Sequence, residues 1–196
     1  MTARAAGAAH LADATAWVLG GTKHAPGVVA AATAASIRLD DAVRLYLTEQ
    51  GSKRLARDDL MTLTMSVLRL RLTAQSLASL PGLGAARGPA AGHPAGSAVR
   101  ASLNRDAGEL ADFYSGLAAE VAKPGAAGSG QSPAVPPIGP PDGPAGSDQL
   151  CLKGPAHYHP EALWVRDHLS HLGSHSAALV GPAARLAALR RRPWWR

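Results

Sequence analysis

The chain has 196 residues, of which 46% are apolar, and its formal net charge is +6. Because 42 residues are alanine and only one is phenylalanine, this composition suits a helical bundle and excludes a large sandwich or barrel, which needs more large side chains. The single cysteine, Cys151, excludes an intramolecular disulfide, and no stretch of about 20 strongly apolar residues predicts a membrane span.

The first 50 residues predict two alanine-rich helices. Residues 1–21 favour a helix and lack the dense Leu/Val core of a signal peptide. Pro26 fits the first turn of a second helix, which is expected to run to residue 50. Its first half is rich in alanine, so close packing but weak anchoring is expected. The apolar face of the first helix consists of Leu11, Ala14, Trp17 and Val18.

The stretch from residue 39 to residue 80 shows the clearest pattern and predicts the core as an αα-hairpin. Asp58 and Asp59 stand where an N-cap is expected for its second helix. The first helix of the hairpin is amphipathic through Leu39, Val43, Tyr46 and Leu47. In the second helix, a spacing of three and four residues places six side chains on one face: Leu60, Leu63, Val67, Leu70, Ala74 and Leu77. A second apolar row widens this face: Met61, Met65, Leu68 and Leu72.

The second half of the chain predicts three more helices and a linker. One helix is capped by Ser97 and ends at Lys123. Residues 124–148, rich in Gly and Pro, predict a disordered linker. Two further helices are expected, from Pro160 to Leu172 and from Ala177 to about Arg192. The predicted fold is therefore all-α, with a bundle over residues 1–123, the linker, and a C-terminal helical segment with a basic tail over residues 149–196.

The positive charge is concentrated near the C-terminus. The last 29 residues, which follow Asp167, contain five arginines and no acidic residue. They therefore carry +5 of the net charge of +6. Arginine beside tryptophan suits an anionic membrane surface, and it also suits nucleic acid. We favour the membrane, because the body has no second basic stripe, although a solvated terminus with tryptophans folded back stays open. The predicted membrane or anion contacts are Arg185, Arg190, Arg191, Arg192, Trp194, Trp195 and Arg196.

The histidines offer a second candidate site. His168, His171 and His175 are spaced three and four residues apart, which places them on one face of a continuous helix, as a Zn²⁺ site requires. Gly173 interrupts that helix, and the spacing matches no known metal motif. We therefore expect no metal and no cofactor, and the absence of a catalytic motif predicts a non-enzymatic protein. A small His-rich metal-binding protein, conceivably a hydrolase, stays an alternative.

Residues 38–77 carry a family resemblance. The run Leu39, Asp40, Asp41, Ala42, the approach from Tyr46 to Gly51, and the alternating Leu and Arg of residues 68–72 resemble the cytosolic C-terminal region of actinobacterial fusaric-acid-resistance-like (FUSC) integral membrane proteins. Residues 163–172 and the basic C-terminus fit the same comparison. An arginine-, alanine- and glycine-rich composition also suggests a GC-rich genome.

The resemblance implies a cytosolic helical domain of a membrane transport or export system, located at the inner face of the cell membrane. Its partner would be a membrane component or an anionic membrane surface, and a helix-face protein partner is also open. A nucleic-acid-binding module acting through the Arg/Trp tail is the remaining alternative, with nucleic acid the less expected partner.

Overall fold

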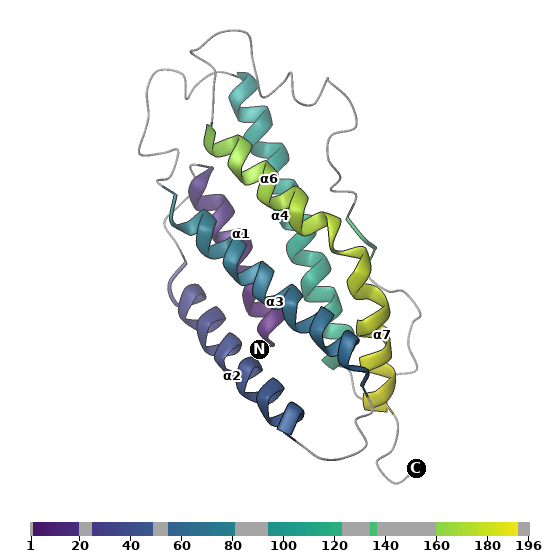
Figure 1. Ribbon diagram of the computed structural model, residues 1–196. Helices are drawn as coiled ribbons and strands as arrows, with labels where there is room; N and C mark the ends of the chain where they lie inside the picture. Colours follow the sequence, from purple (N-terminus) through teal and green to yellow (C-terminus); the bar gives the residue numbers. More distant parts are fainter. Residues whose placement is uncertain are drawn as a thin grey trace.

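The computed structural model describes residues 2–19, 25–48, 55–80, 94–122, 134–136 and 160–191. Within these ranges the chain forms six helices and no strand, which confirms the all-α fold (Figure 1). The helices are α1 (Ala3–Val18), α2 (Val28–Thr48), α3 (Arg57–Ala78), α4 (Pro94–Ala122), α6 (Pro160–Ser174) and α7 (Ala177–Arg191). Of the predicted linker, only residues 134–136 belong to the described part.

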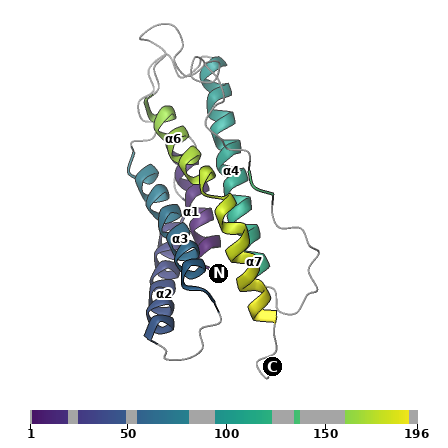
Figure 2. The same ribbon diagram turned by 45° about the vertical axis from the view of Figure 1, so that its right-hand side comes forward.

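Helix α1 is the centre of the bundle. It packs against α2, α3 and α4, and Figure 2 shows it between α3 and α4. Its small residues allow this close packing: a Cβ atom on Gly7 would lie only 2.9 Å from Cδ2 of Leu70 on α3. Thr2 caps the helix, because its hydroxyl accepts a hydrogen bond from the backbone N–H of Ala5. The bundle is therefore organised around α1, whereas the sequence pattern pointed to residues 39–80.

The two helices of the predicted hairpin form, but each packs mainly against α1. Helix α2 touches α3 only sparsely and contacts α1 through a small cluster that includes Ala6, Ala32 and Ala35. Alanine side chains bury little area, so this contact anchors α2 weakly, as its composition indicated. On the outer side of α2, Ile37 and Leu45 are exposed.

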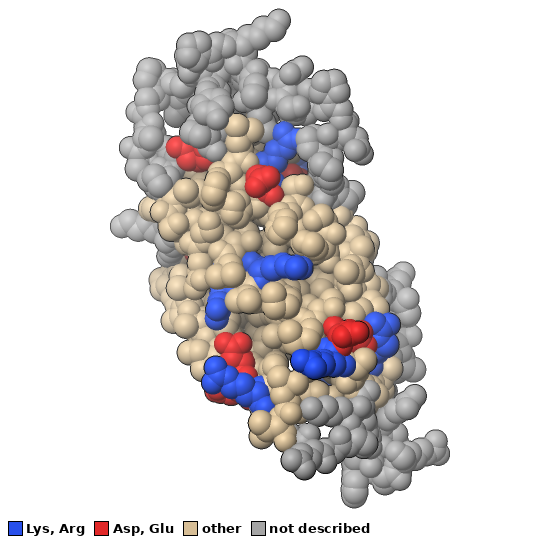
Figure 3. Space-filling view, viewed as in Figure 1, with Lys and Arg blue, Asp and Glu red and all other residues tan. Residues whose placement is uncertain are grey.

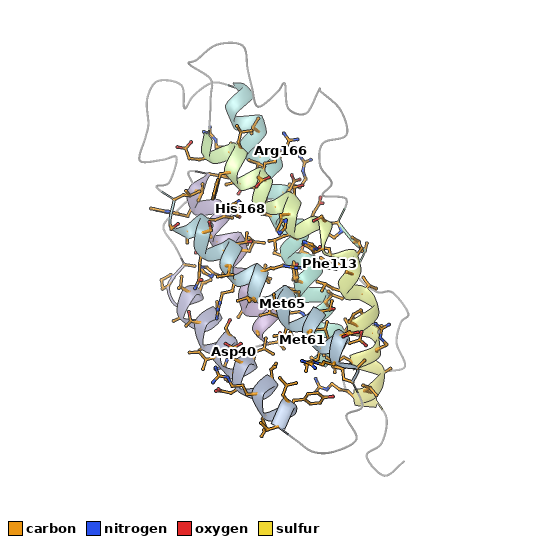
Figure 4. All side chains as sticks on the ribbon, in the orientation of Figure 1. Asp40, Met61, Met65, Phe113, Arg166 and His168 are labelled. Carbon is orange, nitrogen blue, oxygen red and sulfur yellow. The ribbon has the colours of Figure 1, made fainter. Side chains whose placement is uncertain are left out.

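The two apolar rows of α3 have different outcomes. The first row is buried from Leu63 to Leu77, with Leu60 half-buried, which confirms it as a core face. Of the second row, Met61, Met65 and Leu72 are exposed to 42%, 38% and 52%, whereas Leu68 is half-buried, so most of this row lies outside the core. Met61 and Met65 lie one turn apart along α3 (Figure 4). No helix of the described part covers this side of α3.

The start of α3 also differs from the prediction. Ala56 occupies the N-cap position, and its side chain makes no capping hydrogen bond. Asp58 and Asp59 lie inside the first turn, where a negative charge interacts favourably with the helix dipole.

Helices α6 and α7 follow one another along α4 and belong to the same core as α1 (Figures 1 and 2). The break between them falls at His175 and Ser176, so α6 continues through Gly173. The hydroxyl of Ser176 donates a hydrogen bond of 3.2 Å to the carbonyl oxygen of Leu172, which helps to close the end of α6. Helix α4 begins at Pro94, three residues before the predicted cap. The shared core includes Leu110, Phe113 and Leu117 of α4, Val165 and Leu169 of α6, and Leu179 of α7.

Candidate functional site

A cavity of about 610 Å³ lies at one end of the bundle, where α1 and α3 begin and α2, α4 and α7 end. This volume falls within the range of about 300–1,000 Å³ that is typical of small-molecule sites. The walls are mostly aliphatic, and five helices supply them. The lining includes Val43 of α2, Leu63 and Val67 of α3, Val121 of α4, and Leu186 and Leu189 of α7.

The C-terminal half of α2 forms one wall of this cavity. Leu39, Val43 and Tyr46 line it and are half-buried, whereas Leu47 is exposed. The hydroxyl of Tyr46 donates a hydrogen bond of 3.0 Å to the carbonyl oxygen of Leu55, which ties the end of α2 to the segment before α3. The apolar face that predicted a hairpin contact therefore faces a cavity for most of its length.

The most unusual side chain of the cavity is Arg4. It lines the cavity from the first turn of α1, and only 8% of its surface is exposed. One terminal nitrogen donates a long hydrogen bond of 3.5 Å to the carbonyl oxygen of Leu63, and Nε is buried without a hydrogen-bond partner. Among the described residues, no carboxylate forms an ion pair with Arg4.

The electrostatic surroundings of Arg4 contain a phenol. Burial lowers the pKa of Arg4, and Tyr114 opposes this shift. Tyr114 of α4 is itself buried, and this burial raises its pKa. A side-chain hydrogen bond with Ser176 and the positive charges of Arg4 and Arg69 lower the pKa of Tyr114 by a smaller amount. An un-ionised phenol does not neutralise a guanidinium, so the positive charge of Arg4 lacks a counter-ion in the described structure.

The predicted membrane contacts divide into four groups. Arg185 forms two hydrogen bonds of 2.6 Å with the carboxylate of Asp59, so its charge is balanced within the fold. Arg190 lines the cavity and donates a hydrogen bond of 3.0 Å to the carbonyl oxygen of Val121. Arg191 ends α7, and nothing is described of its side chain. Arg192, Trp194, Trp195 and Arg196 lie outside the described residues.

The structure does not gather the three candidate histidines into a ligand set. His168 stacks on Trp164, with ring centroids 4.5 Å apart, and its Nδ1 lies 3.0 Å from the Trp164 carbonyl oxygen. His171 and His175 pack edge to face at 4.9 Å. Burial lowers the pKa of His175, as do the positive charge of Arg69 and His171. In the described ranges, no three His, Cys, Asp or Glu side chains are grouped as a metal site would require.

None of the helices in the described part is both long and apolar enough to cross a bilayer. On the face shown in Figure 3, positive and negative side chains form small separate groups, and no continuous basic stripe is visible there. That distribution gives a nucleic-acid duplex no extended track on this face.

The chain has no match among the family models, the curated proteins or the solved structures with which it was compared.

The sequence interpretation missed Arg4, although its position carries a signal. Arg4 lies four residues before Ala8 and seven before Leu11, so it shares the apolar helical face of α1. A single arginine on the inner face of an alanine-rich helix is a candidate for a buried cation.

Proposed function

We propose that this chain is a non-enzymatic helical domain that binds an apolar small molecule in the cavity at the end of the bundle. The observation that carries this proposal is the cavity itself, with its volume of about 610 Å³ and its aliphatic walls. Such walls remove apolar surface of a ligand from water, which is the main source of affinity for an apolar molecule.

The chemistry of the lining favours binding over catalysis. General acid–base catalysis needs a group that titrates near the working pH, most often His, Glu or Asp. The described residues that line the cavity include no His, Cys, Asp or Glu, and their polar members are Thr2, Arg4, Tyr46, Thr64 and Arg190. This set can hold and orient a ligand, and it contains none of the side chains that most often transfer a proton.

We further propose that the domain works with a membrane transport or export system at the inner face of the cell membrane. The support comes from the sequence: the resemblance of residues 38–77 and the basic C-terminal tail with its two tryptophans. The geometry adds one point. Arg190 lines the cavity, so the tail leaves α7 at the same end of the bundle as the proposed binding site.

Ligand binding can be tested with N-phenyl-1-naphthylamine, an uncharged dye whose emission increases in apolar surroundings. The full chain should bind the dye saturably. Val43→Trp should weaken this binding, because the indole would extend from α2 into the cavity. Ala34→Trp is the matched control, since Ala34 lies on the same helix, is exposed, and does not line the cavity.

A second control separates the cavity from the exposed row on α3. Met65→Gln removes apolar surface outside the cavity and should leave dye binding unchanged. Absence of saturable binding to the full chain would overturn the proposal. So would equal binding by the Val43→Trp and Ala34→Trp variants when both unfold cooperatively.

A further inference from the structure

The charge distribution of the cavity is one-sided. Arg4 stands in its wall as a buried cation, and Arg190 adds a second positive charge, whereas no acidic side chain of the described residues lines it. An ionised group without a counter-ion is costly to bury. Arginine does not escape this cost by losing its proton, because a guanidinium in a protein stays protonated.

The hydrogen-bonding state of Arg4 shows which donors are available. A guanidinium has five N–H donors, and the described contacts of Arg4 use one of them, at the long distance of 3.5 Å. Nε has no partner. A guanidinium presents parallel N–H groups in a planar fork, which is the geometry that binds a carboxylate through two hydrogen bonds.

We propose that the cavity binds an aliphatic monocarboxylate, with its carboxylate on Arg4 and its hydrocarbon chain against the apolar walls; this rests on the proposed ligand-binding function. An anion would supply the missing counter-ion of Arg4 and satisfy its open donors. The walls explain the aliphatic chain, since they are built from Leu, Val and Ala side chains, with Tyr46 as the single aromatic residue among the described lining. A small inorganic anion would leave these walls unfilled.

The same reasoning sets an order of affinity among head groups. Decanoate, 1-decanol and decylammonium share one hydrocarbon chain and differ in charge. Decanoate should displace N-phenyl-1-naphthylamine from the full chain at a concentration about tenfold or more below that of 1-decanol, because charge-assisted hydrogen bonds are roughly twice as strong as neutral ones. Decylammonium should be the weakest competitor, since two arginines repel it.

The variant Arg4→Met assigns the preference to one residue. It keeps an unbranched side chain of similar length and removes the charge, so the dye should still bind while the advantage of decanoate over 1-decanol disappears. Arg4→Lys keeps the positive charge but lacks the planar guanidinium, so it should retain part of the advantage of decanoate over 1-decanol. Arg190→Gln is the matched control, because Arg190 lines the same cavity but is exposed. It should reduce the advantage of decanoate over 1-decanol only slightly.

The outcomes separate the ligand class from the binding function. If the dye binds and Val43→Trp blocks it, but decanoate and 1-decanol compete equally, the proposal of a carboxylate ligand is wrong. The proposal that the cavity binds apolar molecules then still stands. Retention of the decanoate preference in Arg4→Met also overturns the assignment. A melting temperature provides an independent readout: Arg4→Met should melt at or above the temperature of the unchanged chain, because it removes a buried charge without a counter-ion. If this variant does not fold, the head-group series on the unchanged chain and on Arg4→Lys still decides.

Discussion

Asp59 in the first turn of α3 and Arg185 on α7 are joined by two hydrogen bonds of 2.6 Å, across 126 residues of sequence. The carboxylate is mostly buried and the guanidinium largely exposed. The contact holds the beginning of α3 against α7 beside the cavity, which both helices line. A bidentate pair of this kind restricts how the two helices can shift relative to one another.

This pair predicts a specific loss of stability in acid. The hydrogen bonds from Arg185 lower the pKa of Asp59, burial acts against them, and the positive charge of Arg185 lowers it further. The folded chain therefore binds this proton less readily than the unfolded chain, so the stabilisation is complete above the ordinary aspartate range and is lost as the pH falls through the lowered native pKa.

Urea unfolding between neutral and acidic pH measures this effect. The unchanged chain should lose part of its free energy of unfolding on acidification, and Asp59→Asn should lack that part. Asp58→Asn is the matched control, because Asp58 is exposed in the same helical turn. An identical pH dependence in the unchanged chain and in Asp59→Asn would contradict the role of the pair.

Gly7 and Gly108 should respond in opposite directions to substitution by alanine. Both lie inside helices, where alanine is intrinsically better by about 0.5–1 kcal/mol. A Cβ atom on Gly108 meets nothing within 4 Å, so Gly108→Ala should raise the melting temperature. Gly7→Ala should lower it, because the new Cβ presses on fully buried Leu70 and overpacking costs about 1–3 kcal/mol.

A double-mutant cycle identifies the cause. In the background of Leu70→Ala, the substitution Gly7→Ala should no longer be unfavourable, because the atoms that it presses on are gone. If Gly7→Ala stabilises the unchanged chain as much as Gly108→Ala does, the close contact between α1 and α3 is not tight.

The two rows of α3 should differ sharply in their sensitivity to truncation. Leu70 is fully buried and Leu72 is 52% exposed, although they are two residues apart on one helix. Leu70→Ala should lower the free energy of unfolding by about 2–5 kcal/mol through lost burial and a residual cavity. Leu72→Ala should change it by less than about 0.5 kcal/mol. Chemical denaturation of the two variants checks both values, and similar losses would mean that the second row is covered.

The basic tail should bind anionic vesicles. Arginines collect near anionic headgroups and tryptophans settle at the interface, so co-sedimentation should require anionic lipid, weaken with salt and shift tryptophan emission to the blue. Deleting residues 192–196 should greatly reduce it. This deletion removes two arginines, and the double variant of Arg38→Gln and Arg44→Gln, which removes two positive charges from exposed positions on α2, serves as the control. Stronger retention on a random DNA duplex at the same ionic strength would favour the nucleic-acid alternative.

Local patterns were sufficient to predict the helices. The second helix of the predicted hairpin, with its N-cap expected at Asp58 and Asp59, is observed as Arg57–Ala78, and those expected from Pro160 and Ala177 start at these residues. Such boundaries follow from neighbours along the chain: helix formers, prolines, glycines and the spacing of apolar residues. The buried row of α3 was predictable for the same reason, since its members share a face whatever the helix packs against.

Only the tertiary structure decided which faces meet. The central place of α1 depends on Gly7 and the alanines letting α3 approach closely, and small side chains carry little hydrophobic signal in a sequence. Three of the four apolar residues in the second row of α3 are exposed, because burial requires a neighbouring helix on that side. The pairing of Asp59 with Arg185 and the burial of Arg4 both arise from helices far apart in sequence. Periodicity within one helix determines its face, whereas packing between helices determines what that face contacts.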